Sequence, residues 1–207
     1  MDHTLREWIR LGEKCGLAQA ALDAQAKETR MDRTHIRQVM LAHWHDMQSA
    51  IRTGLEPGLR SVSGLSGGQA VKLLNRMQEG KSLCGTLLGK AEAYALATAE
   101  CNACMGKIVA APTAGACGIL PGLLQALAEE RNLHEDALVD ALFVAAAVGE
   151  SIASQASISG AEGGCQAECG SAAAMAAAAM VFLEGGTPQQ SADAAAFTIM
   201  NLLGLVC

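Results

Sequence analysis

The stretch AAAMAAAAM, residues 172–180, indicates the fold class of this sequence. Alanine has the highest helix propensity of the natural residues, and its small side chain lets neighbouring helices approach closely. We therefore expect a tightly packed central helix here. Aromatic residues make up only 3% of the chain, whereas β-sandwich strands favour aromatic and β-branched residues. The sequence predicts an all-α fold, a compact bundle of Ala/Gly-rich helices whose Gly-rich loops form a ligand site.

Outward from this stretch, the pattern of apolar residues predicts further helices. Ser82 is a candidate N-cap, and Asn132 with Glu135 and Thr187 with Gln190 have the spacing of a capping box. The predicted helices are 69–79, 83–105, 117–130, 134–153, 165–184 and 188–203.

The N-terminal quarter has a different character. Two or three amphipathic helices are expected before the loop GLEPGLRSVSG, residues 54–64, and the last of them begins after Asp32 and ends at Gly54. We therefore expect three segments: N-terminal amphipathic helices in 1–54, a linker and Gly-rich loop in 55–68, and a helical core in 69–207, which the family resemblance given below implies to be catalytic and incomplete at its C-terminus.

Charge and length exclude several classes of protein. The 207 residues carry a net charge of −6, and all 15 Lys and Arg lie at or before Arg131. A nucleic-acid partner is not expected, because binding phosphates requires basic side chains. The start of the chain has no apolar signal-peptide core, and the longest uncharged run, residues 108–128, contains two prolines and several glycines. We expect one cytoplasmic domain, with or without a small appendage, and no membrane span.

Three Gly-rich segments precede predicted helices: SGLSGG (63–68), APTAGACG (111–118) and SISGAEGGC (157–165). A glycine turn that leads into a helix presents backbone N–H groups and the positive end of the helix dipole, which favours a bound anion. Lys72 would lie on the first turn after the first segment. The spacing differs from that of a phosphate-binding P-loop, so a small carboxylate is the expected ligand. The alternative for each segment is an ordinary helix cap.

The eight cysteines suit a reducing compartment better than a disulfide scaffold. Cys165 follows two glycines at a predicted helix start, where the dipole favours the thiolate, and it is the best ligand candidate. Cys101 and Cys104 have the CxxC spacing of a metal or redox site, but they lie in an apolar helix where packing thiols are the alternative.

Five segments in order carry a resemblance to a known family: SGLSGGQAVKL, NACMGKIVAAPTAGACGILPG, ASISGAEGGCQAECGSAAAMAAAA, GGTPQQSADA and NLLGLVC. From about residue 34 to the end, the sequence resembles the α chain of the iron–sulfur-dependent L-serine dehydratases, lyases that convert L-serine to pyruvate and ammonia in amino acid catabolism and gluconeogenesis. The resemblance implies a partner, the separate β chain of the dehydratase.

The resemblance also implies a [4Fe–4S] cluster on three cysteines, with one iron open to the substrate. By motif, Cys165 and Cys207 are two of the ligands, and Cys169 is an alternative ligand. The third ligand of the family follows Cys207, so the sequence is expected to be a truncated α chain. The open iron is expected to act as a Lewis acid on the serine hydroxyl.

The Gly-rich turns would orient the substrate carboxylate. The expected substrate-binding residues are Ser66, Gly67, Gly68, Lys72, Thr113, Ala114 and Gly115. The identity of the general base is not fixed by the resemblance. Lys72 and His45 are candidates in this chain, and the β chain is another possible source of the base.

Three alternatives remain at this point. In the first alternative, the chain is a non-catalytic helical subunit or scaffold whose cysteines are core thiols. In the second, it has the same fold but acts on another β-hydroxy amino acid such as threonine. A pyridoxal phosphate enzyme fits less well, because the lysines show no recognisable Schiff-base pattern.

Overall fold

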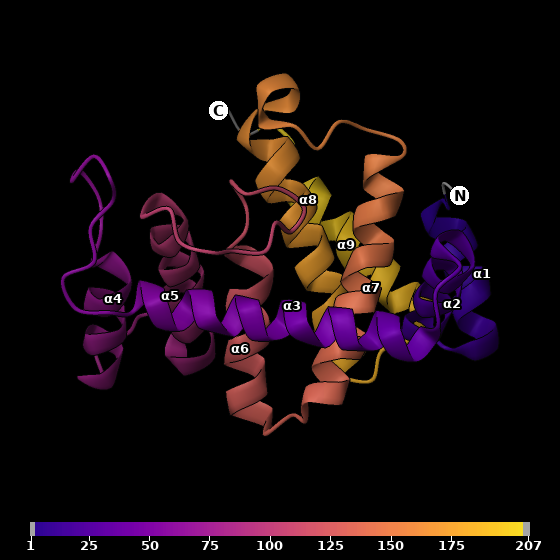
Figure 1. Cartoon of the computed structure of the whole chain (residues 1–207), viewed down its shortest axis with the longest axis horizontal. Helices are drawn as coiled ribbons and strands as arrows, with labels where there is room; N and C mark the ends of the chain where they lie inside the picture. The colour runs from indigo at the N-terminus through magenta and orange to yellow at the C-terminus, as the bar shows by residue number, and fades with distance from the viewer. Residues whose placement is uncertain (1–2, 205–207) are drawn as a thin grey trace. The chain divides into compact units, whose positions relative to one another are not determined.

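The computed structural model describes residues 3–204, and this part of the chain is built of α-helices without strands (Figure 1). The all-α prediction is confirmed, and most helices lie within a few residues of their predicted bounds. The largest difference concerns the helix predicted at 165, which begins at Gly160. The helices are α1 (Leu5–Cys15), α2 (Leu17–Thr29), α3 (Arg33–Gly54), α4 (Gln69–Gln78), α5 (Gly85–Ala103), α6 (Ile119–Arg131), α7 (Glu135–Ala153), α8 (Gly160–Leu183) and α9 (Pro188–Asn201).

The chain divides into two compact units. Unit 1 contains the residues up to Ala42 and those from His134 onward, and unit 2 contains His43–Leu133. Helix α3 therefore begins in unit 1 and ends in unit 2. These two units are defined by contacts within the fold, whereas the segments 1–54, 55–68 and 69–207 are defined by the sequence pattern. The boundaries of the three segments remain a prediction.

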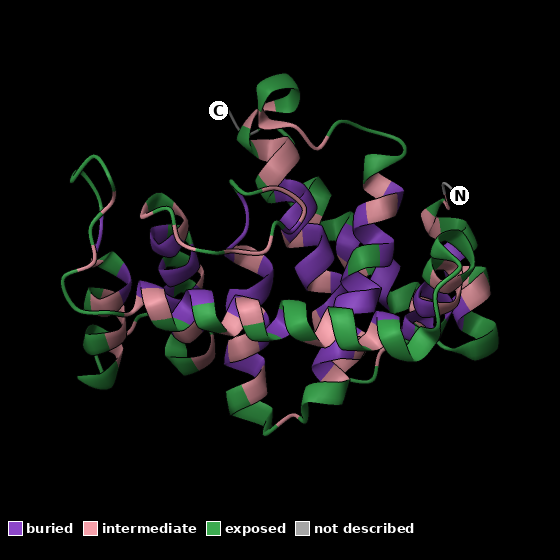
Figure 2. Cartoon of the chain, in the orientation of Figure 1, coloured by how far each residue is buried: buried purple, intermediate pink, exposed green. Residues whose placement is uncertain are grey.

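In unit 1, α8 packs against both α7 and α9, and the alanine stretch lies in its buried half (Figure 2). Close approach of α7 and α8 is possible where a glycine of α7 faces a larger side chain of α8. A Cβ added to Gly149 of α7 would lie 2.9 Å from the sulfur of Met175 in α8. The prediction of a tightly packed central helix is confirmed by the burial of Ala172, Ala174, Ala176, Ala178 and Ala179.

Helix α8 is also the one helix in the described residues that is long and apolar enough to cross a membrane. Of its most apolar 18-residue window, 44% is buried inside the structure. Because α8 packs on two other helices of unit 1, core packing accounts for this apolar composition.

Helix starts show which local signals decided the structure. Thr187 and Gln190 form the predicted capping box of α9, and the Asp32 carboxylate accepts a hydrogen bond from Thr34 N at 2.9 Å. The other capping predictions are wrong. The N-cap of α7 is His134, whereas Asn132 adopts a left-handed conformation (φ 57°) that ends α6, and the N-cap of α5 is Cys84 rather than Ser82. Asn tolerates this conformation better than most residues, which explains its use as a C-cap.

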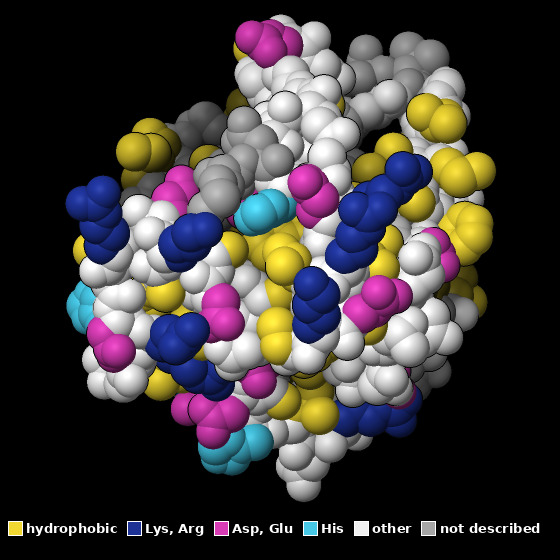
Figure 3. Space-filling view, turned by 90° about the vertical axis from the view of Figure 1, so that its right-hand side faces the viewer, with side chains coloured by type: hydrophobic (Ala, Val, Ile, Leu, Met, Phe, Trp, Pro, Cys, Tyr) yellow, Lys and Arg dark blue, Asp and Glu magenta, His cyan; other side chains and the backbone are white. Residues whose placement is uncertain are grey.

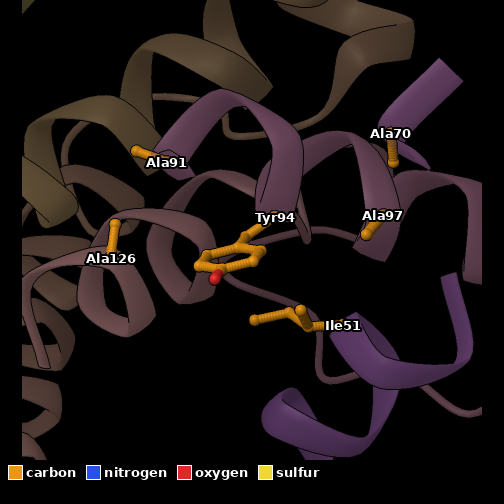
Figure 4. Packing of buried hydrophobic residues seen from close by; sticks show 6 residues of the cluster. All are labelled: Ile51, Ala70, Ala91, Tyr94, Ala97 and Ala126. Atoms are coloured by element: carbon orange, nitrogen blue, oxygen red, sulfur yellow. The ribbon is translucent and has the colours of Figure 1, made fainter. Parts of the chain in front are cut away.

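In unit 2, α5 packs against α4 and α6 around a small core (Figure 4). A Cβ on Gly118 would lie 2.2 Å from the Ala95 carbonyl oxygen, and one on Gly122 would lie 2.6 Å from Ala95 N. Glycine therefore allows the main chains of α5 and the α6 region to touch. The core residues are Ile51, Ala70, Ala91, Tyr94, Ala97 and Ala126.

The surface carries charges of both signs. In the face shown in Figure 3, Lys and Arg side chains are interleaved with Asp and Glu side chains. Such mixing prevents a strong field of one sign over this face.

Candidate functional site

The SGLSGG segment forms a closed turn that leads into α4. Ser61 N donates to Ser66 O at 2.9 Å, and Ser66 N donates to Ser61 Oγ at 3.2 Å. Gly67 has φ 135° and lies so close to the preceding chain that a Cβ would be 2.3 Å from Leu59 O. Gly68 is the N-cap of α4 with φ 81°. Both glycines are required by backbone conformation, and Gly67 also by space.

A buried acid, Glu100 of α5, binds the start of α4. The residue is 7% exposed, and its two carboxyl oxygens accept hydrogen bonds from the N–H groups of three residues. The distances are 2.9 Å to Gly68 N, 2.7 Å to Gln69 N and 3.4 Å to Ala70 N. The N–H groups that were expected to bind a ligand anion at this helix start instead donate to a carboxyl group of the chain itself.

Glu100 is not among the site residues predicted from the sequence. A signal was present, because Glu100 lies among Ala93, Ala97 and Cys101 on the buried side of an apolar helix. A charged residue at such a position requires polar partners from elsewhere in the fold.

Lys72 lies in the first turn of α4, where its N–H donates to Gly68 O at 3.3 Å, and its side chain is exposed. His45 lies on α3 within unit 2 and is also exposed. Beside it, Asp46 forms an ion pair with Lys107 at 2.8 Å. The two candidate bases are therefore solvent-accessible residues of the same unit.

The second Gly-rich segment connects α5 and α6. Asn102 Nδ2 donates to Ala114 O at 3.0 Å, and this bond fixes the middle of the segment. Thr113 Oγ1 is buried and has no hydrogen-bond partner among the described residues. Gly115, two residues after Thr113, is exposed. A buried hydroxyl without a partner is costly, so Thr113 has an unused donor and acceptor for a ligand.

The C-terminal turns of α5 bring the two segments of unit 2 together. Glu100 binds the start of α4, and Asn102 binds Ala114. Two further bonds come from the same end of α5: Val62 N donates to Ala103 O at 3.3 Å, and Cys104 Sγ donates to Arg60 O at 2.7 Å. One helix end therefore positions both groups of predicted substrate-binding residues.

The third segment and Cys165 belong to unit 1. Helix α8 starts at Gly160 with Ser159 as N-cap, and Gly164 then interrupts the helical backbone (φ 71°, ψ −172°). Cys165 follows this break directly, so it begins the second helical part of α8, and its side chain is exposed. Cys169 lies one turn further along and is exposed too. Cys207 lies outside the described residues.

Two cysteines of unit 2 are buried instead. Cys101 and Cys117 are each 1% exposed. Burial raises the pKa of the Cys117 thiol to about 11 and also raises the pKa of Cys101. Neutral buried thiols pack as small apolar groups. Within residues 3–204 no group of three His, Cys, Asp or Glu residues is arranged to hold a metal ion.

Comparison with known proteins shows a family similarity over most of the chain. The sequence pattern of the family "Serine dehydratase alpha chain" matches residues 12–207, so the similarity begins earlier than the expected residue 34. The probable L-serine dehydratase alpha chain of Bacillus subtilis is 49% identical over 209 residues, which cover 100% of this chain and 69% of that protein.

Two further relatives have related names. The L-serine dehydratase alpha chain of Peptoniphilus asaccharolyticus is 40% identical over 100% of this chain and 72% of its own length. The L-serine dehydratase of Streptomyces coelicolor is 36% identical over 97% of this chain and 45% of its own length. Enzymes of this name are lyases. The family pattern and the high identity to the Bacillus protein together show that this chain belongs to the serine dehydratase alpha-chain family.

Proposed function

We propose that this chain is the α chain of a cytoplasmic L-serine ammonia-lyase, which converts L-serine to pyruvate and ammonia together with a separate β chain. The observation that carries the proposal is the family match over residues 12–207. The names of the Bacillus and Peptoniphilus relatives, both alpha chains, support the division into two chains.

The substrate carboxylate would bind at the two Gly-rich segments of unit 2. Ser66, Thr113 and Lys72 offer two hydroxyls and an ammonium group, and such donors suit a carboxylate. The small residues Gly68, Ala114 and Gly115 would leave room for the substrate near the backbone, whereas Gly67 would support the turn through its contact with Leu59. The unpartnered Oγ1 of Thr113 supports this assignment, since a ligand oxygen would satisfy it.

Elimination of water from serine requires a base for the weakly acidic α-proton and assistance for a poor leaving group. Lys72 and His45 are the base candidates in this chain, and both are accessible. A fixed carboxylate would hold the α-proton in one direction relative to the base. Loss of the base would lower kcat strongly, whereas loss of a carboxylate contact would raise KM.

We propose Cys165 and Cys207 as two of the ligands of a [4Fe–4S] cluster. The donor chemistry at Cys165 fits, because its thiol is exposed at a helix start. The described residues supply this one thiol of the proposed set and no complete metal-binding group. When bound, such a cluster would supply Lewis-acid chemistry for departure of the hydroxyl group.

The test is reconstitution of the complete α chain with its β chain, iron and sulfide under anaerobic conditions. We expect visible absorbance from thiolate-to-iron charge transfer and release of pyruvate from L-serine, with slower turnover of L-threonine. Cys165→Ala should lose both the absorbance and the activity, whereas Cys15→Ala, which removes another exposed thiol of unit 1, should keep them. Equal behaviour of the two variants would exclude Cys165 as a ligand. Faster turnover of threonine would change the assigned substrate.

A further inference from the structure

We infer that Glu100 is a positioning residue for the substrate segment: it fixes the backbone that carries Ser66 and Lys72 by binding the N-terminus of α4. The inference rests on the proposed function for the identity of the substrate. The hydrogen bonds between Glu100 and the start of α4, which lies more than 30 residues away in sequence, do not depend on the proposed function. They follow from the geometry of the structure alone.

The hydrogen bonds of Glu100 are directed at one target. Oε2 accepts from Gly68, and Oε1 accepts from Gln69 and Ala70. These are the N-cap residue and the first two residues of α4, whose N–H groups have no acceptor within the helix. Another acid of unit 2, Glu129, differs because its partners are the side chains of Lys90, Tyr94 and Gln125. Glu100 therefore serves the start of α4 rather than an ion pair.

A second contact fixes the same backbone from the other direction. Gly67 touches the main chain of Leu59, Arg60 Nη1 donates to Gly67 O at 3.3 Å, and Gly67 N donates to Gln69 Oε1 at 3.0 Å. With Glu100 bound to the next three residues, the backbone of 67–70 is restrained throughout. Ser66 directly precedes this restrained stretch, and Lys72 follows it by two residues.

This geometry changes how the substrate carboxylate would be recognised. The N–H groups of Gly68, Gln69 and Ala70 already have a carboxylate partner, so a second carboxylate would have to displace Glu100. Recognition by the side chains of Ser66 and Lys72 avoids this competition. Glu100 then acts through these residues, and its replacement should weaken serine binding without removing a group that touches serine.

The experiment compares wild type, Glu100→Gln, Glu100→Asp and Glu92→Gln in the reconstituted two-chain enzyme. Glu92 lies two turns earlier on α5 and is exposed, so it is a matched control. The glutamine amide turns one of the two acceptors of Glu100 into a donor that faces a backbone N–H. Aspartate keeps both acceptor oxygens but is one methylene shorter.

For Glu100→Gln we expect hydrogen exchange of the amides in 66–72 to be roughly tenfold faster, and KM for L-serine to rise roughly tenfold with kcat changed much less. Glu100→Asp should lie between this variant and wild type, and Glu92→Gln should match wild type. If Glu100→Gln does not fold, Glu100→Asp carries the same comparison with a smaller effect.

Two results would overturn the inference. One is an unchanged KM in a folded Glu100 variant. The other is faster exchange throughout α4, α5 and α6 with a lower active fraction and no change in KM, which would indicate general destabilisation. A wild-type complex that does not deaminate serine would instead refute the proposed function, while the exchange measurement would still report whether Glu100 fixes residues 66–72.

Discussion

Gly54, the last residue of α3, lies directly against the main chain of Ala97 in α5: a Cβ on Gly54 would be 1.8 Å from the Ala97 carbonyl oxygen. The obstructing atoms belong to the backbone and cannot rotate away as a flexible side chain does. Since α5 also carries Glu100, this contact between the end of α3 and the middle of α5 sets the position of a helix that organises the candidate site.

Replacing Gly54 by alanine should therefore strain unit 2. Overpacking of a well-packed contact typically costs about 1–3 kcal/mol, so we expect the thermal midpoint to fall by roughly 3–10 °C. Arg52→Ala is the control, because Arg52 is an exposed residue of the same helix end. Differential scanning calorimetry measures both variants. Equal midpoints for Gly54→Ala and wild type would show that α3 and α5 separate without loss of stability.

Tyr94 should titrate at unusually high pH. Burial, followed by the hydrogen bond to Glu129 and the charge of that carboxylate, raises the Tyr94 pKa far above its usual value of 10.0. The chain has one tyrosine, so absorbance at 295 nm during an alkaline titration reports this side chain alone. We expect no phenolate signal until well above pH 10, or until the protein unfolds.

The same pKa shift has a consequence for stability. The folded state holds the Tyr94 proton more tightly than the unfolded chain does, so this contribution is fully present below pH 10. It is lost as the pH rises above 10 and the unfolded chain releases its proton. Tyr94→Phe should remove this part of the alkaline destabilisation. An identical dependence of stability on pH in wild type and Tyr94→Phe would contradict the prediction.

Thiol reactivity should separate the cysteines by location. At pH 8 a thiol of pKa about 11 is almost entirely protonated, so Cys117 should react roughly a hundredfold or more slowly than the exposed Cys15 and Cys84. Alkylation followed by peptide mass spectrometry gives the individual rates. In urea all cysteines should react at similar rates, which is the control for intrinsic differences. Rapid labelling of Cys117 in the folded chain would show that unit 2 opens readily.

The capping box of α9 should contribute measurably to stability. Thr187 Oγ1 accepts from Gln190 N at 3.2 Å, and Gln190 Oε1 accepts from Thr187 N at 2.8 Å. Thr187→Ala removes the first bond, and such a loss costs about 1 kcal/mol. Thr187→Ser keeps the hydroxyl and should stay close to wild type in urea unfolding. If serine and alanine are equally destabilising, the lost stability comes from the threonine methyl group instead.

Several features of the site were accessible from sequence because they depend on short stretches of chain. The Gly-rich segments, the exposed Lys72 and the position of Cys165 at the start of a helical stretch lie where local rules place them. Glu100 was not accessible in the same way. Its role depends on hydrogen bonds to residues 68–70, and sequence spacing does not show which helix lies beside another.

The sequence by itself determined the helices, the burial of the alanine stretch at 172–180, and the caps at Asp32 and Thr187. These features could be predicted because helix propensity, apolar periodicity and capping act within a few residues. Only the tertiary structure decided why Gly54 is glycine and what occupies the N-terminus of α4. Gly54 ends α3 as predicted, yet its backbone is helical, and the requirement comes from contact with Ala97 rather than from a left-handed turn. In both cases the interacting residues are distant in sequence: Gly54 contacts Ala97, and Glu100 binds residues 68–70. The packing of whole helices brings these residues together.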